Sequence, residues 1–92
     1  MNHLHYEFDV GPTQTIQVTL DHQAYVRLLD SDNYKKYRTG QKYTYYGGLQ
    51  TVSPAHLRAP SQGHWHLVID LGGYPGTVRA LVQILEGSDA RV

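Results

Sequence analysis

Hydrophobic and polar residues alternate along most of this chain with a period of two. In Leu4–Val10 every second side chain is apolar, and His5, Glu7 and Asp9 stand between them. This pattern is typical of a β-strand with one buried face. The same signal predicts further strands at Thr15–Asp21, Ala24–Asp30, Lys42–Tyr46, Ala55–Ala59, His64–Leu71 and Thr77–Leu85, and a short one at Leu49–Val52.

The clearest of these strands is His64–Leu71. Trp65, Leu67 and Ile69 share one face, which we expect to point into the core, and the polar residues share the other. Glycine and proline clusters between the strands, at 11–12, 60–63 and 72–76, read as turns.

The connection at 31–40 carries the only helix signal. Its Asp, Ser and Asn residues are typical of helix N-termini. They predict a short helix of one or two turns over Tyr34–Thr39, with Ser31 or Asp32 as the N-cap and Gly40 after the end. Further on, Gly47-Gly48 predicts a sharp bend or bulge that ends the preceding strand.

Seven or eight short strands without a sustained helical stripe indicate an all-β protein. We predict a small antiparallel β-sandwich of jelly-roll type, with a closed β-barrel as the alternative, because spacing does not define strand order. The 92 residues suit one domain. We expect an ordered core at about 2–86 and a frayed C-terminal tail at 87–92.

Composition removes several classes of protein. The chain has no cysteine, which excludes disulfides and thiolate metal sites. No run approaches transmembrane length, and the N-terminus lacks a basic start followed by an apolar stretch. We therefore expect a cytoplasmic protein with no membrane partner. The formal net charge is zero, so nucleic acid is not an expected partner.

Four pieces of the sequence together resemble a known bacterial family, domain of unknown function 1883. They are VRLLDSDNYKKYRTG, YYGGL, SPAHLRAPSQGHWHLVIDLGG and TVRALVQIL, and the likeness covers roughly residues 2 to 86. The resemblance implies a small all-β domain that occurs alone or beside other modules. Some of those modules are TIR-type signalling domains, which makes such proteins candidate partners. It implies no catalytic activity and no cofactor.

The first candidate site is Asn33–Gly48, which holds five of the eight tyrosines, four of the eight Lys and Arg residues, and no acidic residue. Tyrosine and arginine are favoured at protein-binding hot spots. The alternative ligand is a carbohydrate or an anionic polymer. A purely structural role, with tyrosines covering sheet ends, is also open. The predicted binding residues are Tyr34, Lys35, Lys36, Tyr37, Arg38 and Tyr46.

The second candidate is a set of histidines. His64 and His66 share the face opposite Trp65, and His3 and His5 share a face with Glu7. If the two strands were paired in register, the four imidazoles would converge and could bind a metal. Nothing in the sequence shows that the strands are neighbours. Polar residues on a solvated sheet face are the alternative, so we assign no metal and no cofactor.

Catalysis has the weakest support. Ser53 or Ser61 could be combined with His64 and Asp70, but six strand residues at about 3.3 Å each place His64 and Asp70 about 20 Å apart. No nucleophile-elbow motif is present. We therefore expect a non-catalytic binding or accessory module with a protein partner. Exposed strand edges also allow a homodimer.

Overall fold

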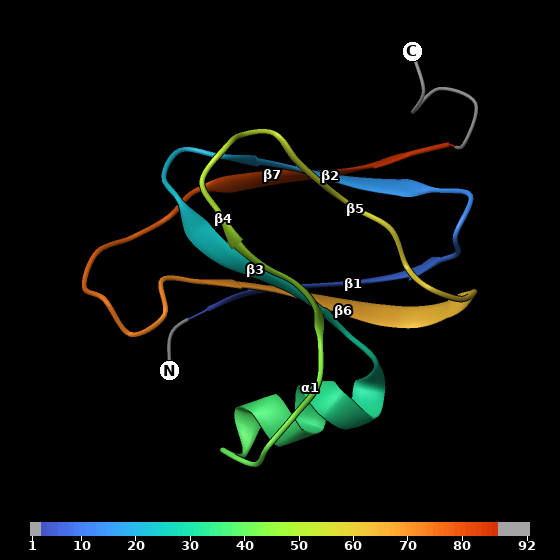
Figure 1. The fold of residues 1–92 in the computed structure, drawn as a ribbon, viewed down its shortest axis with the longest axis horizontal. Helices are drawn as coiled ribbons and strands as arrows, with labels where there is room; N and C mark the ends of the chain where they lie inside the picture. Colours follow the sequence, from blue (N-terminus) through green and yellow to red (C-terminus); the bar gives the residue numbers. More distant parts are fainter. Residues whose placement is uncertain (1–2, 87–92) are drawn as a thin grey trace.

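The computed structural model describes residues 3–86, which form seven strands and one helix (Figure 1). In chain order these are β1 (Leu4–Val10), β2 (Thr15–Leu20), β3 (Ala24–Leu29), α1 (Ser31–Arg38), β4 (Tyr46–Gln50), β5 (Ala55–Leu57), β6 (Gly63–Asp70) and β7 (Ala80–Leu85). The predicted frayed tail at 87–92 lies outside the described residues.

The strands form two antiparallel sheets that face each other. The first sheet has the order β1-β6-β3-β4 and the second has the order β5-β2-β7. In Figure 1 the second sheet lies above the first, and α1 lies below the first sheet. The predicted β-sandwich is confirmed. The closed-barrel alternative is wrong, because the described strands are hydrogen-bonded into two separate sheets.

The core lies between the sheets and is built from every second residue of the strands other than β4, as the alternation predicted. Trp65 is 7% exposed, and its indole Nε1 donates to the Ser61 carbonyl over 3.0 Å. The other core side chains come from both sheets and include Ile16, Val18, Val26, Leu28, Leu67 and Ile69.

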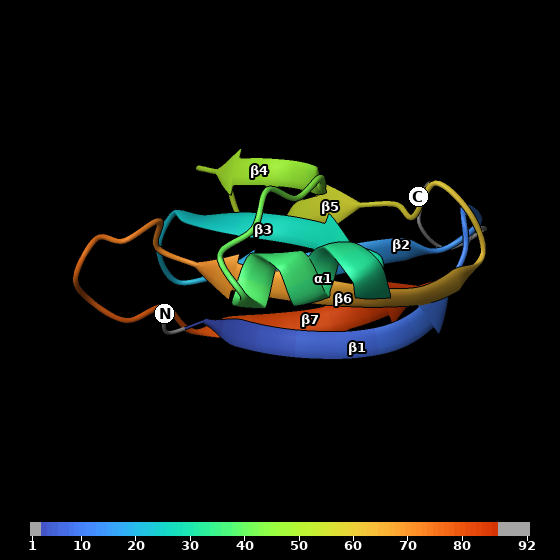
Figure 2. The same cartoon turned by 90° about the horizontal axis from the view of Figure 1, so that it is seen from below.

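Strand β6 is buried on both faces. On the face opposite Trp65, Val68 is 0%, Asp70 3% and His66 7% exposed. Helix α1 lies across this outer face of the first sheet (Figure 2). The alternative of a solvated polar face is therefore wrong for His66 and Asp70, because the connection after β3 folds back over them.

Helix α1 has the predicted length of about two turns but starts earlier than predicted, at Ser31. Its N-cap is Asp30, whose extended backbone and side-chain Oδ1, accepting from the Asn33 N–H over 2.8 Å, begin the helix. Ser31 and Asp32 are therefore not the N-cap. Gly40 follows the C-terminus with φ 77°, as predicted. Within residues 3–86 no helix is long and apolar enough to cross a bilayer.

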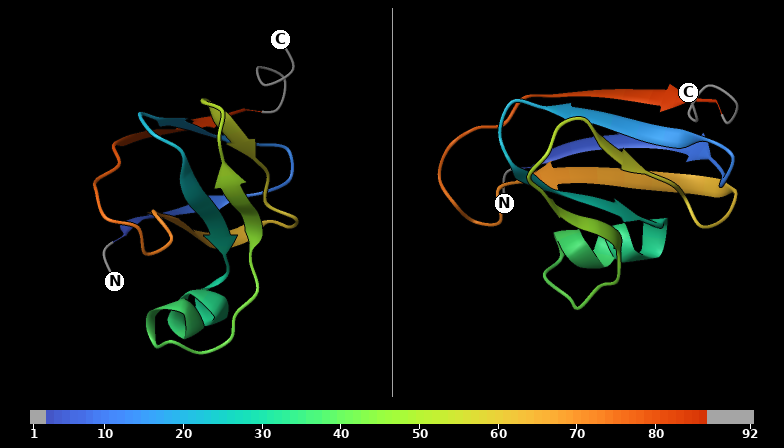
Figure 3. Two further views of the ribbon diagram at one scale, coloured as in Figure 1. Left: turned by 60° about the vertical axis from the view of Figure 1, so that its left-hand side comes forward. Right: turned by 45° about the horizontal axis from the view of Figure 1, so that its top comes forward.

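The predicted strand Lys42–Tyr46 is wrong. Residues 39–45 run without regular structure from α1 back to the sheet (Figure 3), and β4 begins only at Tyr46. Gly47 and Gly48 do not end a strand but pair with Arg27 and Val26 inside one. Their φ angles of 107° and 138° show the unusual backbone that two adjacent glycines indicated.

The remaining boundaries differ at the strand ends. Strand β7 begins at Ala80, three residues after the predicted Thr77, and β5 ends at Leu57. The predicted short strand Leu49–Val52 is shifted, because β4 begins three residues earlier and ends at Gln50. Strands β1, β2, β3 and β6 begin and end within one residue of their predicted limits. The alternation identified the buried face of each strand better than it identified the ends.

Candidate functional site

The outer face of the first sheet brings together the polar residues of β1 and β6. Strand β1 is at the edge of this sheet, and β6 lies next to it. The two strands pair antiparallel, so that Glu7 stands opposite His66 and Asp9 opposite His64. His5 lies on the same face, opposite Val68. This register shows that the two histidine-bearing strands, β1 and β6, are neighbours, which the sequence alone did not show.

His5, Glu7 and His66 form what we call the histidine cluster. His5 Nε2 lies 2.8 Å from His66 Nδ1, and the two rings are stacked with 5.1 Å between their centroids. Glu7 Oε2 is 3.9 Å from His5 Nε2, and Glu7 Oε1 is 4.0 Å from His66 Nδ1. Two nitrogens and a carboxylate thus face one small volume, with ligand atoms within 4.8 Å of one another.

Helix α1 covers the histidine cluster on its outer side. The Tyr34 ring stacks on His5 at 4.2 Å and on His66 at 4.5 Å, between ring centroids. Ser31 Oγ is 3.1 Å from His66 Nε2, the nitrogen on the other side of the ring from His5. Both imidazoles are therefore oriented by residues of one helix.

His64 belongs to the rim of the cluster rather than to its centre. Its Nε2 lies 2.9 Å from Glu7 Oε1 and its Nδ1 lies 3.0 Å from Asp9 Oδ1. These hydrogen bonds raise the pKa of His64, and the bond from His64 lowers the pKa of Glu7. By contrast, burial lowers the pKa of both His5 and His66.

His3 lies at the margin of the histidine group, where its ring meets the His5 ring edge-on at 6.4 Å between centroids. Its Nε2 is 3.5 Å from the Tyr34 hydroxyl, and its ring meets the Tyr37 ring edge-on at 5.3 Å between centroids. Of the four histidines, His5 and His66 therefore come into direct contact, and His64 hydrogen-bonds to Glu7 beside them.

A second polar group lies under α1, and the sequence analysis missed it. Arg27 Nη1 donates to Asp70 Oδ2 over 2.7 Å, and the Tyr37 hydroxyl donates to the same oxygen over 2.7 Å. The backbone N–H of Gly72 donates to Asp70 Oδ1. Burial lowers the pKa of Arg27, but the charge and hydrogen bond of Asp70, together with Tyr43 and Tyr45, raise it above its ordinary value. The only sequence signal was an arginine and an aspartate within strands, with nothing to pair them.

The predicted binding residues separate into three groups. Tyr34 and Tyr37 are half-buried and turn onto the sheet, while Lys35, Lys36 and Arg38 are exposed. Tyr46 pairs with the core residue Leu28 and meets Trp65 edge-on, so it lies on the inner side of the sheet, away from Tyr34. Two tyrosines outside the predicted set, Tyr43 and Tyr45, continue the chain of ring contacts from Tyr37 toward β4.

The serine, histidine and aspartate considered for catalysis are not assembled. Ser53 Oγ accepts from the Leu20 N–H over 2.8 Å, and the Asp70 carboxylate is engaged by Arg27. His64 bonds to Glu7 and Asp9.

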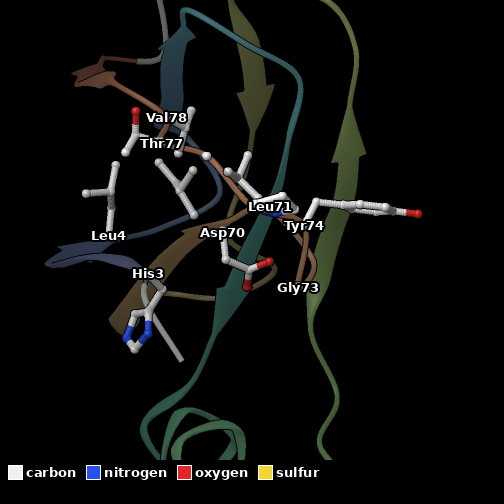
Figure 4. A pocket seen from close by; sticks show the side chains of 11 residues that line it. His3, Leu4, Asp70, Leu71, Gly73, Tyr74, Thr77 and Val78 are labelled. Atoms are coloured by element: carbon white, nitrogen blue, oxygen red, sulfur yellow. The ribbon is translucent and has the colours of Figure 1, made fainter.

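Two shallow grooves flank the turn at 72–76. One of about 500 Å³ lies between His3, Leu4 and Val78, with Asp70 at its side and Tyr74 pointing away (Figure 4). The other, of about 640 Å³, is lined by Tyr25, Leu49 and Tyr74 among others. The Asp70 carboxylate is already neutralised by Arg27, so neither groove gathers charged groups as the histidine cluster does.

The fold and this face define a small antiparallel β-sandwich whose larger sheet is covered by one helix. A family model described as domain of unknown function (DUF1883) matches residues 1–88 of the chain. The chain belongs to this family, as the resemblance of its four sequence pieces predicted. It matches no curated protein and no solved structure significantly.

Proposed function

We propose that this domain is a non-catalytic binding module that docks an acidic segment of a protein partner. The proposed contact is the basic surface, which we define as Lys35, Lys36, Arg38 and Lys42. All four side chains are exposed, and within residues 3–86 none of them pairs with a carboxylate. Arg38 lies over the Tyr34 ring at 5.3 Å but has no carboxylate partner among these residues. This concentration of positive charge without a counter-charge is the observation that carries the proposal, because complementary charge steers and orients a partner.

Exposed large side chains follow the basic surface along the chain. Tyr45 is 42% and Leu49 of β4 is 49% exposed, whereas Tyr46 lies on the inner side of the sheet. Large side chains of this kind supply contact area beside charged groups at protein interfaces. A partner segment with acidic and apolar residues would match this combination.

The positions of Tyr34 and Tyr37 favour a protein over nucleic acid or carbohydrate. Binding of single strands or sugars would use aromatic faces as stacking platforms. The Tyr34 ring is already stacked on two histidines, and the Tyr37 hydroxyl is bonded to Asp70. Partners with TIR-type domains, a cytoplasmic location, a homodimer and the absence of enzymatic activity stay predictions.

A pull-down from lysate of the native cells tests the proposal. The lysate is treated with nuclease and applied to untagged, resin-coupled protein at low and high salt. We expect a protein partner that the variant Lys35→Glu, Lys36→Glu loses, with an affinity at least about tenfold weaker once that partner is purified. We also expect retention to fall at high salt.

The matched control is Arg58→Glu, Arg79→Glu. It makes the same change in charge at two exposed positions outside α1. Equal loss of the partner from both variants would show that net charge rather than this surface matters. Retention that depends on intact nucleic acid would overturn the protein-partner proposal in favour of an anionic polymer.

A further inference from the structure

We propose that the histidine cluster binds one divalent transition-metal ion of the Zn²⁺ class, with His5 Nε2, His66 Nδ1 and Glu7 as the protein ligands. This proposal goes beyond the docking function and is independent of it. The ligands come from β1 and β6, whereas the basic surface belongs to α1 and the connection after it.

The separations between the ligand atoms suit one ion. Zn–N bonds are about 2.0–2.1 Å and Zn–O bonds about 2.0–2.2 Å, so two ligands of one zinc are at most about 4 Å apart. The two nitrogens are 2.8 Å apart, and the carboxylate oxygens lie 3.9 and 4.0 Å from them. An ion can therefore reach both imidazoles after a small outward shift, and a rotation of Glu7 brings an oxygen to it.

The donor set selects the kind of metal. Two imidazoles and one carboxylate suit zinc and its first-row neighbours, whereas calcium and magnesium prefer sites built from oxygen alone. Three protein ligands also leave a fourth coordination position for water or another small ligand.

The groups around the cluster contact the three ligand side chains and orient them, as the residues around a bound metal usually do. Metal-bound histidine usually donates its other ring N–H to a nearby acceptor, and Ser31 Oγ lies 3.1 Å from His66 Nε2. Glu7 is oriented in turn by His64 at 2.9 Å. The Tyr34 ring, stacked on both imidazoles, restricts their rotation. The two imidazoles are thus oriented before an ion arrives, and only small movements are needed to bring all three ligands to it.

The cluster is also accessible from solvent. The side chain of His66 is 9% exposed, that of His5 26% and that of Glu7 49%. The buried imidazole of His66 lies at the bottom of the cluster, and the carboxylate of Glu7 lies on the side that is open to solvent. An ion can enter past Glu7 without any movement of the sheet.

Titration of untagged protein with Zn²⁺, followed by calorimetry, tests the site, and Co²⁺ absorption reports the coordination. We expect one ion per chain. His5→Gln should weaken binding at least about 100-fold, and Glu7→Gln and Ser31→Ala about 10-fold each. A rise in melting temperature with added Zn²⁺ should accompany binding and disappear in His5→Gln.

The matched control is His22→Gln. His22 is an exposed histidine beside Asp21, a pairing that adventitious surface binding would use equally well. This variant should bind Zn²⁺ as the wild type does. The proposal is overturned if His22→Gln and His5→Gln weaken binding equally, or if Glu7→Gln leaves both affinity and the Co²⁺ spectrum unchanged. Glu7 is exposed, so its variant tests the site even if a histidine variant unfolds.

Discussion

Arg27 of β3 and Asp70 of β6 form an ion pair beneath α1, with 2.7 Å between Nη1 and Oδ2. The side chains of the arginine and the aspartate are only 12% and 2% exposed. The Arg27 guanidinium also lies between two aromatic rings, 4.7 Å from Tyr25 and 5.3 Å from Tyr45. This pair ties the two central strands of the larger sheet to the segment that covers them.

Replacing Asp70 with alanine should destabilise the fold strongly. The change leaves the Arg27 charge buried without a counter-charge and the Tyr37 hydroxyl without its acceptor. Removing one partner of a buried ion pair typically costs about 3–5 kcal/mol. The free energy of unfolding, measured by urea denaturation, checks this.

The control is the double variant Arg27→Leu, Asp70→Leu. It removes both charges together, and replacing a whole buried ion pair by apolar residues is often neutral, so we expect it to be more stable than Asp70→Ala by about 3–5 kcal/mol. A loss below about 1 kcal/mol for Asp70→Ala would mean that water reaches Arg27 and that the pair behaves as a surface ion pair.

Tyr37 should make the protein sensitive to alkaline pH. Burial, together with the hydrogen bond to Asp70, raises the pKa of Tyr37 above its ordinary value of 10.0. Below pH 10 the phenol is protonated in both the folded and the unfolded chain. Above pH 10 only the unfolded chain releases this proton, so stability is lost as pH rises. Unfolding curves between pH 8 and pH 11 should show a steeper loss for the wild type than for Tyr37→Phe.

Absorbance of tyrosinate gives an independent readout. While the protein stays folded, wild type and Tyr37→Phe should ionise the same number of tyrosines, because Tyr37 does not contribute. One tyrosine fewer in the variant near pH 10 would show that Tyr37 titrates normally and is not held by Asp70.

Asp30 and Asp32 can be distinguished as N-caps. Asp30 Oδ1 accepts from both the backbone N–H and the side chain of Asn33. Asp30→Ala should therefore cost about 0.5–2 kcal/mol, the usual effect of removing a cap. Asp32→Ala removes only an acidic residue from the first turn, worth about 0.3–1 kcal/mol. Equal melting temperatures for the two variants would contradict the cap assignment.

The alternation of apolar and polar residues correctly predicted features that depend only on residues close together in the sequence. The period-two alternation placed Trp65 in the core and His66 on the opposite face, and both placements are right. It could not reveal that β1 pairs with β6, because the approach of His5 to His66 depends on a pairing between positions 61 residues apart. The histidine cluster was therefore visible only as two separate pairs.

The same limit explains the errors around α1. Polar residues at alternate positions usually mark a solvated face, but a helix from elsewhere in the chain covers His66 and Asp70. Tyr34 and Tyr37 looked like exposed binding residues for the same reason. Gly47 and Gly48 looked like a strand end, although β4 uses their positive φ angles within the strand.

Gly47→Ala should be more costly than Gly40→Ala, although both glycines have positive φ. A Cβ at Gly47 would meet the Val26 carbonyl oxygen and come within 2.9 Å of Leu57 Cδ2, whereas at Gly40 it would meet nothing within 4 Å. The φ penalty is about 1–2 kcal/mol for a residue near the left-handed helical region, as at Gly40, and it is at least as large at Gly47, whose φ of 107° lies farther from that region. The close approach adds about 1–3 kcal/mol at Gly47 alone, so the difference between the two variants is at least this large.

Thermal unfolding of both variants measures that difference. Because Gly47 pairs with Arg27, its substitution should also push β4 away from β3 and loosen the Arg27 side chain beside Tyr45. Amide exchange in β4 should then rise in Gly47→Ala but not in Gly40→Ala, whose site lies beyond the end of α1. Equal melting temperatures and equal exchange would mean that β4 can move aside freely, and that its two glycines serve only the local backbone angles.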